Sequence, residues 1–313
     1  MKKGYIYIML SALLFSTMEI SLKLVSGQFN PIQMIFLRFL IGSLVLAPLA
    51  VRNLIKREIT LNKNDFVFFS LTGFICVVIS MSFYQLAILY CRASTVAVLF
   101  SCNPLFVIPL AYFILKEKIY KHTVVTIILS TVGIMFIMNP MNMSDNAAGI
   151  SFSLFAAVTF ALYSVIGKSK SLRYGGVVLN CFTFLTGSIE MLALIALSKI
   201  GFISAWLTDS GFKIFADIPV IQGISLSSLP ALIYIGIFVT GLGYVFYFLA
   251  MEEVSTSAAS MVFFIKPALA PVLSLIILRE PVSLNIVIGI ALITIGSSVT
   301  FISNSLRTKL SVS

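Results

Sequence analysis

Apolar segments of about 20 residues, separated by short polar stretches, recur along the whole chain. A hydrocarbon core about 30 Å thick needs roughly 20 apolar residues per helix, so each segment is long enough to cross a bilayer. The pattern therefore predicts ten membrane-spanning helices. The expected spans cover residues 4–25, 31–51, 66–89, 95–115, 122–138, 148–167, 177–197, 229–251, 257–278 and 284–302.

The composition agrees with this pattern. Hydrophobic residues make up 59% of the 313 positions and charged residues only 10%, whereas a soluble domain carries roughly 25% charged residues. A soluble globular protein is therefore excluded. The first span follows Lys2 and Lys3, as the apolar part of a signal peptide would. No small-residue cleavage site follows that span, so we expect a retained helix.

The basic residues are distributed unevenly between the two sides of the predicted bundle. The net charge is +10, from 21 Lys and Arg against 11 Asp and Glu. With the N-terminus inside, 14 of the 21 basic residues lie at the inner side, and the outer loops hold only Arg92, Lys199, Lys213 and Arg279. Cytoplasmic loops carry such an excess. We therefore expect a multi-pass protein of the cell (plasma) membrane with both termini cytoplasmic, whose basic charge contacts lipid headgroups and not nucleic acid.

The second half of the sequence repeats the first at two fixed offsets. From the third span onward the offset is 163, which places Pro104 on Pro267 and Phe100 on Phe263. The first two spans match at an offset of 145. We therefore expect two five-span repeats, at 1–140 and 147–306. Because five is an odd number, the second copy crosses the membrane in the opposite sense, which is an arrangement typical of transporters.

The change of offset means that 18 extra residues entered the second half, in the outer loop 201–226. Trp206, Phe212, Phe215 and Ile218 follow one another there at helix-like spacing. The loop is interpreted either as a short amphipathic helix at the outer membrane interface or as a disordered connection.

Related short motifs occur in the same order in both halves. Arg38-Phe39-Leu40 follows Pro31, Asn103-Pro104 leads to Leu115-Lys116-Glu117, and Lys266-Pro267 leads to Leu278-Arg279-Glu280-Pro281. With these motifs and its tandem halves, the chain resembles over its whole length the drug/metabolite transporter superfamily, specifically the EamA-type ten-span transporters. The resemblance implies an all-α membrane protein of ten helices, arranged as two inverted five-helix repeats around a central cavity. It also implies transport of metabolites, amino acids or drug-like compounds, often as export.

The predicted function is a secondary transporter that exports small solutes by alternating access, with proton coupling as an open alternative. Its partners would be a small-molecule substrate and the lipid bilayer, and the chain would act as a monomer or a homodimer. A non-transporting membrane receptor or scaffold is the alternative. An enzyme is disfavoured because the only histidine, His122, lies at the inner end of a span, which leaves no Ser-His pair or zinc site within the membrane. No cofactor or metal is expected.

Ionisable residues inside the predicted spans are candidates for the site. Inserting a charged side chain at the centre of a membrane helix costs roughly 2.5–3.5 kcal/mol, so such residues are found mainly where they face a cavity or a partner. Glu19 and Lys23 are four residues apart, a spacing that permits an ion pair on one helix face. Alternatively, Glu19 faces the cavity and exchanges protons. Arg38 either binds backbone carbonyls or Glu19 and so locks two helices together, or binds a substrate carboxylate.

Lys266 is the leading candidate for substrate binding, with Asn103 as its counterpart in the first half. Each directly precedes a proline, Pro104 or Pro267, that is expected to kink its helix and free backbone carbonyls near the middle of the membrane. The alternative for Lys266 is a structural pair with Glu190 or another carboxylate. Glu190 itself is expected to be a buried hydrogen-bonding group or a proton carrier.

Aromatic residues complete the predicted site. Tyr84 and Tyr247 occupy equivalent places in the third and eighth spans, and Tyr163 projects from the sixth. Aromatic walls suit amphipathic or cationic ligands. The alternative is that these rings serve helix packing.

Overall fold

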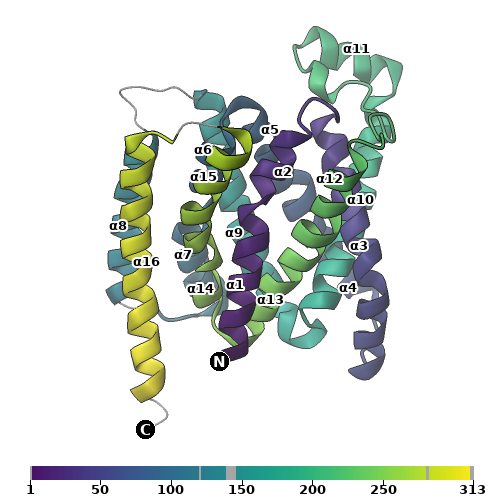
Figure 1. The fold of residues 1–313 in the computed structure, drawn as a ribbon. Helices are drawn as coiled ribbons and strands as arrows, with labels where there is room; N and C mark the ends of the chain where they lie inside the picture. Colours follow the sequence, from purple (N-terminus) through teal and green to yellow (C-terminus); the bar gives the residue numbers. More distant parts are fainter. Residues whose placement is uncertain (1, 120, 139–145, 280–281, 311–313) are drawn as a thin grey trace.

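The computed structural model describes residues 2–119, 121–138, 146–279 and 282–310, and within these ranges the chain is helical, without strands (Figure 1). The first half contains α1 (Lys2–Ser16), α2 (Met18–Leu24), α3 (Pro31–Lys56), α4 (Lys63–Gly73), η1 (Phe74–Ser80), α5 (Met81–Tyr90), α6 (Ala93–Phe100), α7 (Asn103–Leu115) and α8 (Lys121–Met138). The second half contains α9 (Ala147–Tyr174), α10 (Gly176–Ser198), α11 (Gly201–Asp209), η2 (Lys213–Phe215), α12 (Leu229–Ile233), η3 (Tyr234–Leu242), α13 (Gly243–Glu253), α14 (Thr256–Ala259), α15 (Val262–Leu278) and α16 (Leu284–Leu310).

Seven helical stretches are long and apolar enough to cross a membrane. They cover Lys3–Leu24, Pro31–Lys56, Lys63–Tyr90, Ala93–Leu115, Ala147–Tyr174, Gly176–Ser198 and Leu229–Glu253. Three more apolar helices, α8, α15 and α16, stand beside them (Figure 1). The chain is thus an all-helical membrane protein with at least these seven candidate spans.

Local sequence explains where several helices begin and end. Asn30 caps α3 in a reciprocal capping box with Gln33, and Pro31 stands at the first helical position. The helices α7 and α15 stop at Lys116 and Arg279, which adopt left-handed conformations with φ of 59° and 56°. These two residues are 163 positions apart, like the sequence repeat. The motif residues Glu280 and Pro281 lie outside the described residues.

Two π-helical segments interrupt long spans at similar places in the two halves. The segment η1 lies between α4 and α5, and η3 lies between α12 and α13. A π-helical turn inserts an extra residue per turn and commonly marks a functional site. Further breaks separate α1 from α2, α6 from α7 and α14 from α15, so at least five of the described spans carry irregular backbone.

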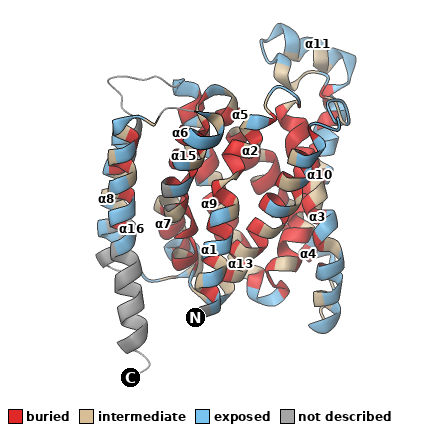
Figure 2. Ribbon diagram, viewed as in Figure 1, coloured by how far each residue is buried: buried red, intermediate tan, exposed pale blue. Residues whose placement is uncertain are grey.

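Helix packing places apolar side chains both inside and outside the bundle. The interior holds one large cluster of buried aromatic and aliphatic residues, whereas the outer faces of α3, α4 and α15 expose apolar side chains, as a lipid-facing surface requires (Figure 2). At one edge of the bundle α8 and α16 pack side by side (Figure 1). Their backbones approach closely at Gly133, where a Cβ would lie 2.8 Å from the carbonyl oxygen of Gly289.

The inserted segment 201–226 contains helix α11 and the 3₁₀ turn η2 and is ordered against the bundle. The Asn30 amide donates to the carbonyl of Ile214 at 2.8 Å. The Gln33 amide donates to the carbonyls of Val220 and Gln222, at 3.1 and 2.6 Å. The helical alternative therefore describes 201–209, and α11 lies at the end of the bundle opposite the chain termini (Figure 1).

Candidate functional site

A buried ion pair joins the two halves of the chain. Lys266 Nζ contacts Glu19 Oε1, and the two side chains are 1% and 0% exposed. Glu19 lies in α2, which begins just after the helix break at Thr17, and Lys266 lies in α15 directly before Pro267. The alternative prediction for Lys266 was a structural pair with Glu190 or another carboxylate. Such a pair forms, and its carboxylate is Glu19 and not Glu190.

The expected intrahelical pair of Glu19 with Lys23 does not form. Lys23 Nζ instead donates to the carbonyl oxygens of Ile88 and Cys91, at 2.8 and 3.0 Å. These carbonyls belong to the C-terminal end of α5, where the last turn of a helix leaves its carbonyls without partners in the helix. Lys23 therefore ties α2 to the end of α5 and leaves Glu19 available to Lys266.

Aromatic rings face the lysine of the pair. Lys266 Nζ lies 5.0 Å from the ring centroid of Phe100 and 5.7 Å from that of Tyr84. Both distances fit cation–π attraction, which strengthens when water is excluded. The Tyr84 hydroxyl has no hydrogen bond of ordinary geometry, yet it interacts electrostatically with both Glu19 and Arg38.

Arg38 is fully buried in α3 within the same neighbourhood. Its guanidinium carbon lies 4.9 Å from the centroid of the Phe39 ring. Among the described residues, none of its Nε, Nη1 and Nη2 atoms has a hydrogen-bond partner. Within the described part of the chain, Arg38 therefore donates to no backbone carbonyl, whereas Glu19, the other partner expected to lock two helices together, interacts with it electrostatically.

Asn103 is buried where α7 begins, next to the break after α6. Its amide donates to the carbonyl of Ala157 in α9 at 2.9 Å, and its Oδ1 has no partner in the described part of the chain. Pro104 stands in the first turn of α7, so the irregularity there is a complete helix break, whereas Pro267 lies inside α15.

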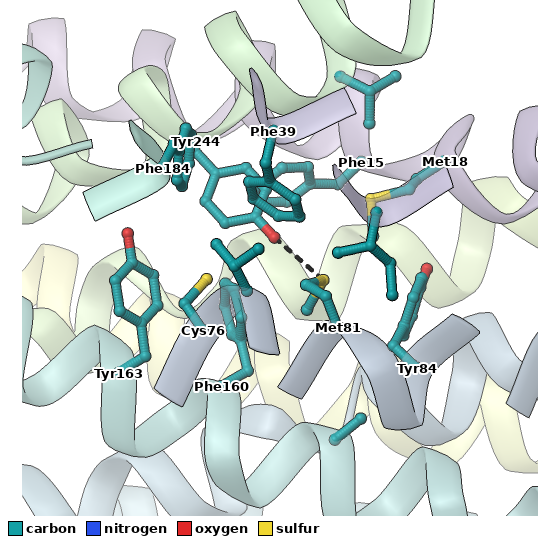
Figure 3. Close-up of a cluster of buried hydrophobic side chains, with 14 of the residues drawn as sticks. Phe15, Met18, Phe39, Cys76, Met81, Tyr84, Phe160, Tyr163, Phe184 and Tyr244 are labelled. Carbon is teal, nitrogen blue, oxygen red and sulfur yellow. Dashed lines mark hydrogen bonds between the residues drawn. The ribbon is translucent and has the colours of Figure 1, made fainter. Parts of the chain in front are cut away.

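A layer of aromatic and sulfur-containing side chains fills the centre of the bundle (Figure 3). Tyr244 reaches from α13 toward Met81 of α5, and its hydroxyl donates to Met81 Sδ at 3.4 Å (Figure 3). Tyr163 donates to Asn180 Oδ1 at 2.9 Å. Tyr247 packs its ring on neighbouring aromatics, and its hydroxyl has no hydrogen bond among the described residues.

Glu190 forms a different contact. One of its oxygens accepts a hydrogen bond from Ser70 of α4, and the other has no partner in the described residues. The structure gives no contact of Glu190 with Lys266 or Arg38 within its described ranges. The two carboxylates proposed from the sequence therefore occupy separate surroundings.

A second feature is an apolar cavity of about 590 Å³ below the inserted segment. Ile203, Leu207 and Phe212 of that segment form its cover, together with Phe215 and Ile218. Side chains of α3, α5, α9 and α10 form the rest of the wall, nearly all of them apolar. Of the covering side chains, Ile218 is buried and Ile203, Leu207 and Phe215 are half-buried, whereas Phe212 stays exposed.

The sequence prediction missed several residues of this neighbourhood. Phe100 faces Lys266, and Phe263 packs on Tyr247 with ring centroids 5.5 Å apart. The repeat places Phe100 on Phe263, and this duplication of a bulky aromatic beside the Asn103 and Lys266 positions was a signal for both. Tyr244, in contrast, carries no sequence signal that separates it from other aromatics of its span.

Comparison with known proteins places the chain among transporters. The sequence model of the EamA-like transporter family matches residues 2–139 and again residues 147–302. A protein of Clostridium kluyveri named "Uncharacterized transporter" is 43% identical over 312 residues, which cover 97% of this chain and 94% of that protein. The Bacillus subtilis protein named "Uncharacterized transporter YetK" is 26% identical over 273 residues, covering 85% of this chain and 77% of the relative.

The fold also has a counterpart among solved structures. A chain described as "Crystal structure of protein" superimposes with a TM-score of 0.70, covering 95% of this chain and 96% of that chain. The two sequences are 17% identical. At this identity the similarity shows a shared fold alone.

Proposed function

Because the chain belongs to the EamA-like transporter family, we propose that it is a secondary carrier that exports small metabolites, amino acids or drug-like solutes by alternating access. The observation that carries the proposal is the buried Glu19–Lys266 pair, which joins the two halves in the apolar interior. Such a pair is costly to bury and is typical of substrate or ion pathways in membrane proteins.

The proposed architecture is a ten-span bundle of two inverted five-helix repeats, at 1–140 and 147–306. The twofold match of the family model supports it. The starts of two helices support it too, because Lys2 of α1 and Ala147 of α9 are 145 residues apart, which is the first offset of the sequence repeat. The left-handed caps at Lys116 and Arg279 recur at the second offset of 163. In the proposed orientation both termini lie in the cytoplasm, and α11 lies at the outer face of the cell membrane.

Contacts between the halves at the proposed inner end are candidates for a gate. Asp65 accepts hydrogen bonds from Arg173, at 3.3 Å, and from Tyr174, at 2.5 Å. Glu117 accepts from the backbone nitrogens of Thr256 and Ser257, at 3.1 and 3.4 Å. Opening of the central site toward the cytoplasm would require these polar contacts to separate.

Proton coupling is part of the proposal. Glu19 is its first candidate, because a proton on this carboxylate would remove the charge that holds Lys266. The groups that face Glu19 are Lys266 of α15, Tyr84 of α5 and Arg38 of α3. Glu190, hydrogen-bonded to Ser70, is the second candidate.

The test is solute flux into liposomes that hold the purified protein. Counterflow of labelled amino acids, organic acids, amines and nucleosides is measured with and without a pH gradient. Saturable flux of at least one solute supports a carrier, whereas binding of a solute without any flux indicates a receptor. If neither Glu19→Gln nor Glu190→Gln alters the pH dependence of flux, proton coupling through these carboxylates is wrong.

A further inference from the structure

The buried charges of the central site do not balance. Glu19 is paired with Lys266, and Lys23 is bound to backbone carbonyls at the end of α5. Arg38 is the remaining buried cation of this neighbourhood, and it is fully buried. Within the described residues, the groups that interact with it electrostatically are Tyr244, Tyr84, Cys76 and Glu19, of which only Glu19 is a carboxylate, and Glu19 is already paired with Lys266.

An unpaired guanidinium in an apolar interior is unfavourable, because a buried ion loses its hydration without a compensating contact. All three nitrogens of Arg38 are in this condition among the described residues. A guanidinium presents its donors as a planar fork that matches the two oxygens of a carboxylate. A single negative charge brought in by a ligand would therefore satisfy the fork and balance the summed charge of the three fully buried groups, Glu19, Lys266 and Arg38.

The surroundings of Arg38 define the rest of the ligand. Its guanidinium packs on Phe39, whose ring is 4.8 Å from that of Phe184 and 5.9 Å from that of Tyr244, measured between centroids. Figure 3 shows these three rings together on one side of the layer, with Tyr84 on the opposite side. Among the described residues the Tyr84 hydroxyl has no hydrogen bond of ordinary geometry. It interacts electrostatically with Glu19 and, more weakly, with Arg38, so it can serve as a second donor for a ligand oxygen beside Arg38.

We propose that the transported substrate is an organic anion of one negative charge, whose carboxylate binds Arg38 and Tyr84 and whose apolar body contacts the aromatic layer. This inference rests on the proposed carrier function and specifies its substrate class. Lys266 does not take the carboxylate in this arrangement, because it is occupied by Glu19. A zwitterion would leave the positive charge of the cluster unbalanced, and a cation would add to it.

Three probes of one carbon skeleton test the charge preference. 3-Phenylpropionate carries only the carboxylate, phenylalanine adds an ammonium group, and phenethylamine carries only the ammonium group. We expect 3-phenylpropionate to bind the purified protein most tightly and to be taken up into liposomes by counterflow. Arg38→Gln should weaken its binding about ten- to a hundredfold, as expected when hydrogen bonds to a charged group are lost. Arg38→Lys should restore part of the affinity, because it keeps the charge but loses the fork.

The control is Arg52→Gln, the same substitution at an exposed position of the same helix, which should leave affinity and flux unchanged. Preferred binding or flux of phenylalanine or phenethylamine would overturn the anion inference while leaving a carrier. So would unchanged 3-phenylpropionate affinity in Arg38→Gln. Binding of 3-phenylpropionate without flux of any solute in the wider panel would retain an anion site and contradict the carrier function instead. If none of the three probes binds while another solute is transported, the substrate class proposed for Arg38 is wrong.

Discussion

Replacement of Lys266 by methionine would leave the Glu19 carboxylate buried without its cation. Both side chains are essentially inaccessible to solvent. Removal of one partner of a buried ion pair costs about 3–5 kcal/mol, because the remaining charge keeps its desolvation cost without its attraction. We expect Lys266→Met and Glu19→Gln each to lower the free energy of unfolding by this amount. The double variant Glu19→Gln/Lys266→Met buries no charge at these two positions and should lie within about 2 kcal/mol of the wild type, since neutral replacement of a buried pair is often tolerated.

The assay is equilibrium unfolding of the four proteins in detergent micelles or lipid nanodiscs. Independent effects would add to about 6–10 kcal/mol in the double variant, so the expected coupling between the two sites is at least about 4 kcal/mol. Lys23→Met provides the control. Lys23 is four residues from Glu19 but binds backbone carbonyls, so its replacement should show little coupling to Glu19→Gln. Additive losses in the Glu19/Lys266 cycle, or strong coupling with Lys23, would refute the pairing.

Measurements of solute flux distinguish a structural role of the Glu19–Lys266 pair from a role in transport. The double variant is expected to fold and to lose solute flux, because the proposed mechanism requires charge at this site. Flux at the wild-type rate in the folded double variant would show that the pair serves only stability and would remove Lys266 from the substrate site.

Three further predictions concern the contacts around the site. Gly73→Ala should lower the free energy of unfolding by about 1–3 kcal/mol, because a Cβ there would lie 2.7 Å from the backbone nitrogen of Gly187. The control for this unfolding measurement is Gly201→Ala, whose Cβ would meet nothing within 4 Å. Asp65→Asn should weaken the contact with Arg173 at the inner end and increase thiol labelling of a cysteine introduced at that end, and unchanged labelling would exclude this contact from the gate. Gln33→Ala removes two hydrogen bonds to the inserted segment and should accelerate amide hydrogen exchange at 212–226, whereas unchanged exchange would show that other contacts hold the segment.

Hydropathy was sufficient to locate the helices because each span must satisfy its own backbone hydrogen bonds in lipid. The predicted spans 31–51 and 229–251 begin at the same residues as α3 and α12. Internal irregularities were less predictable. Pro104 indicated one break, but the π-helical segments η1 and η3 carry no proline that would have marked them in the sequence.

The sequence identified the buried ionisable residues as candidates for the site but did not predict how they pair. Burial cost marked Glu19, Arg38 and Lys266 as residues that need a partner or a cavity. Spacing along one helix favoured Lys23 for Glu19, whereas the structure selects Lys266, 247 positions away, through the packing of α15 against α2. Pairing across helices depends on rotation and depth, which sequence spacing does not encode. The same limit explains why the missing partner of Arg38 emerged only from the structure.

Alternating access of the central site is tested most directly by thiol labelling from each side of the membrane. Tyr84→Cys is introduced into a chain whose four native cysteines, all buried, are replaced by serine or alanine. The protein is placed in sealed vesicles and treated with a membrane-impermeant thiol reagent from outside or from inside. The carrier mechanism predicts that Tyr84→Cys reacts from both sides, at rates that a transported solute shifts in opposite directions. Reaction from one side only, or rates that no transported solute changes, would contradict alternating access.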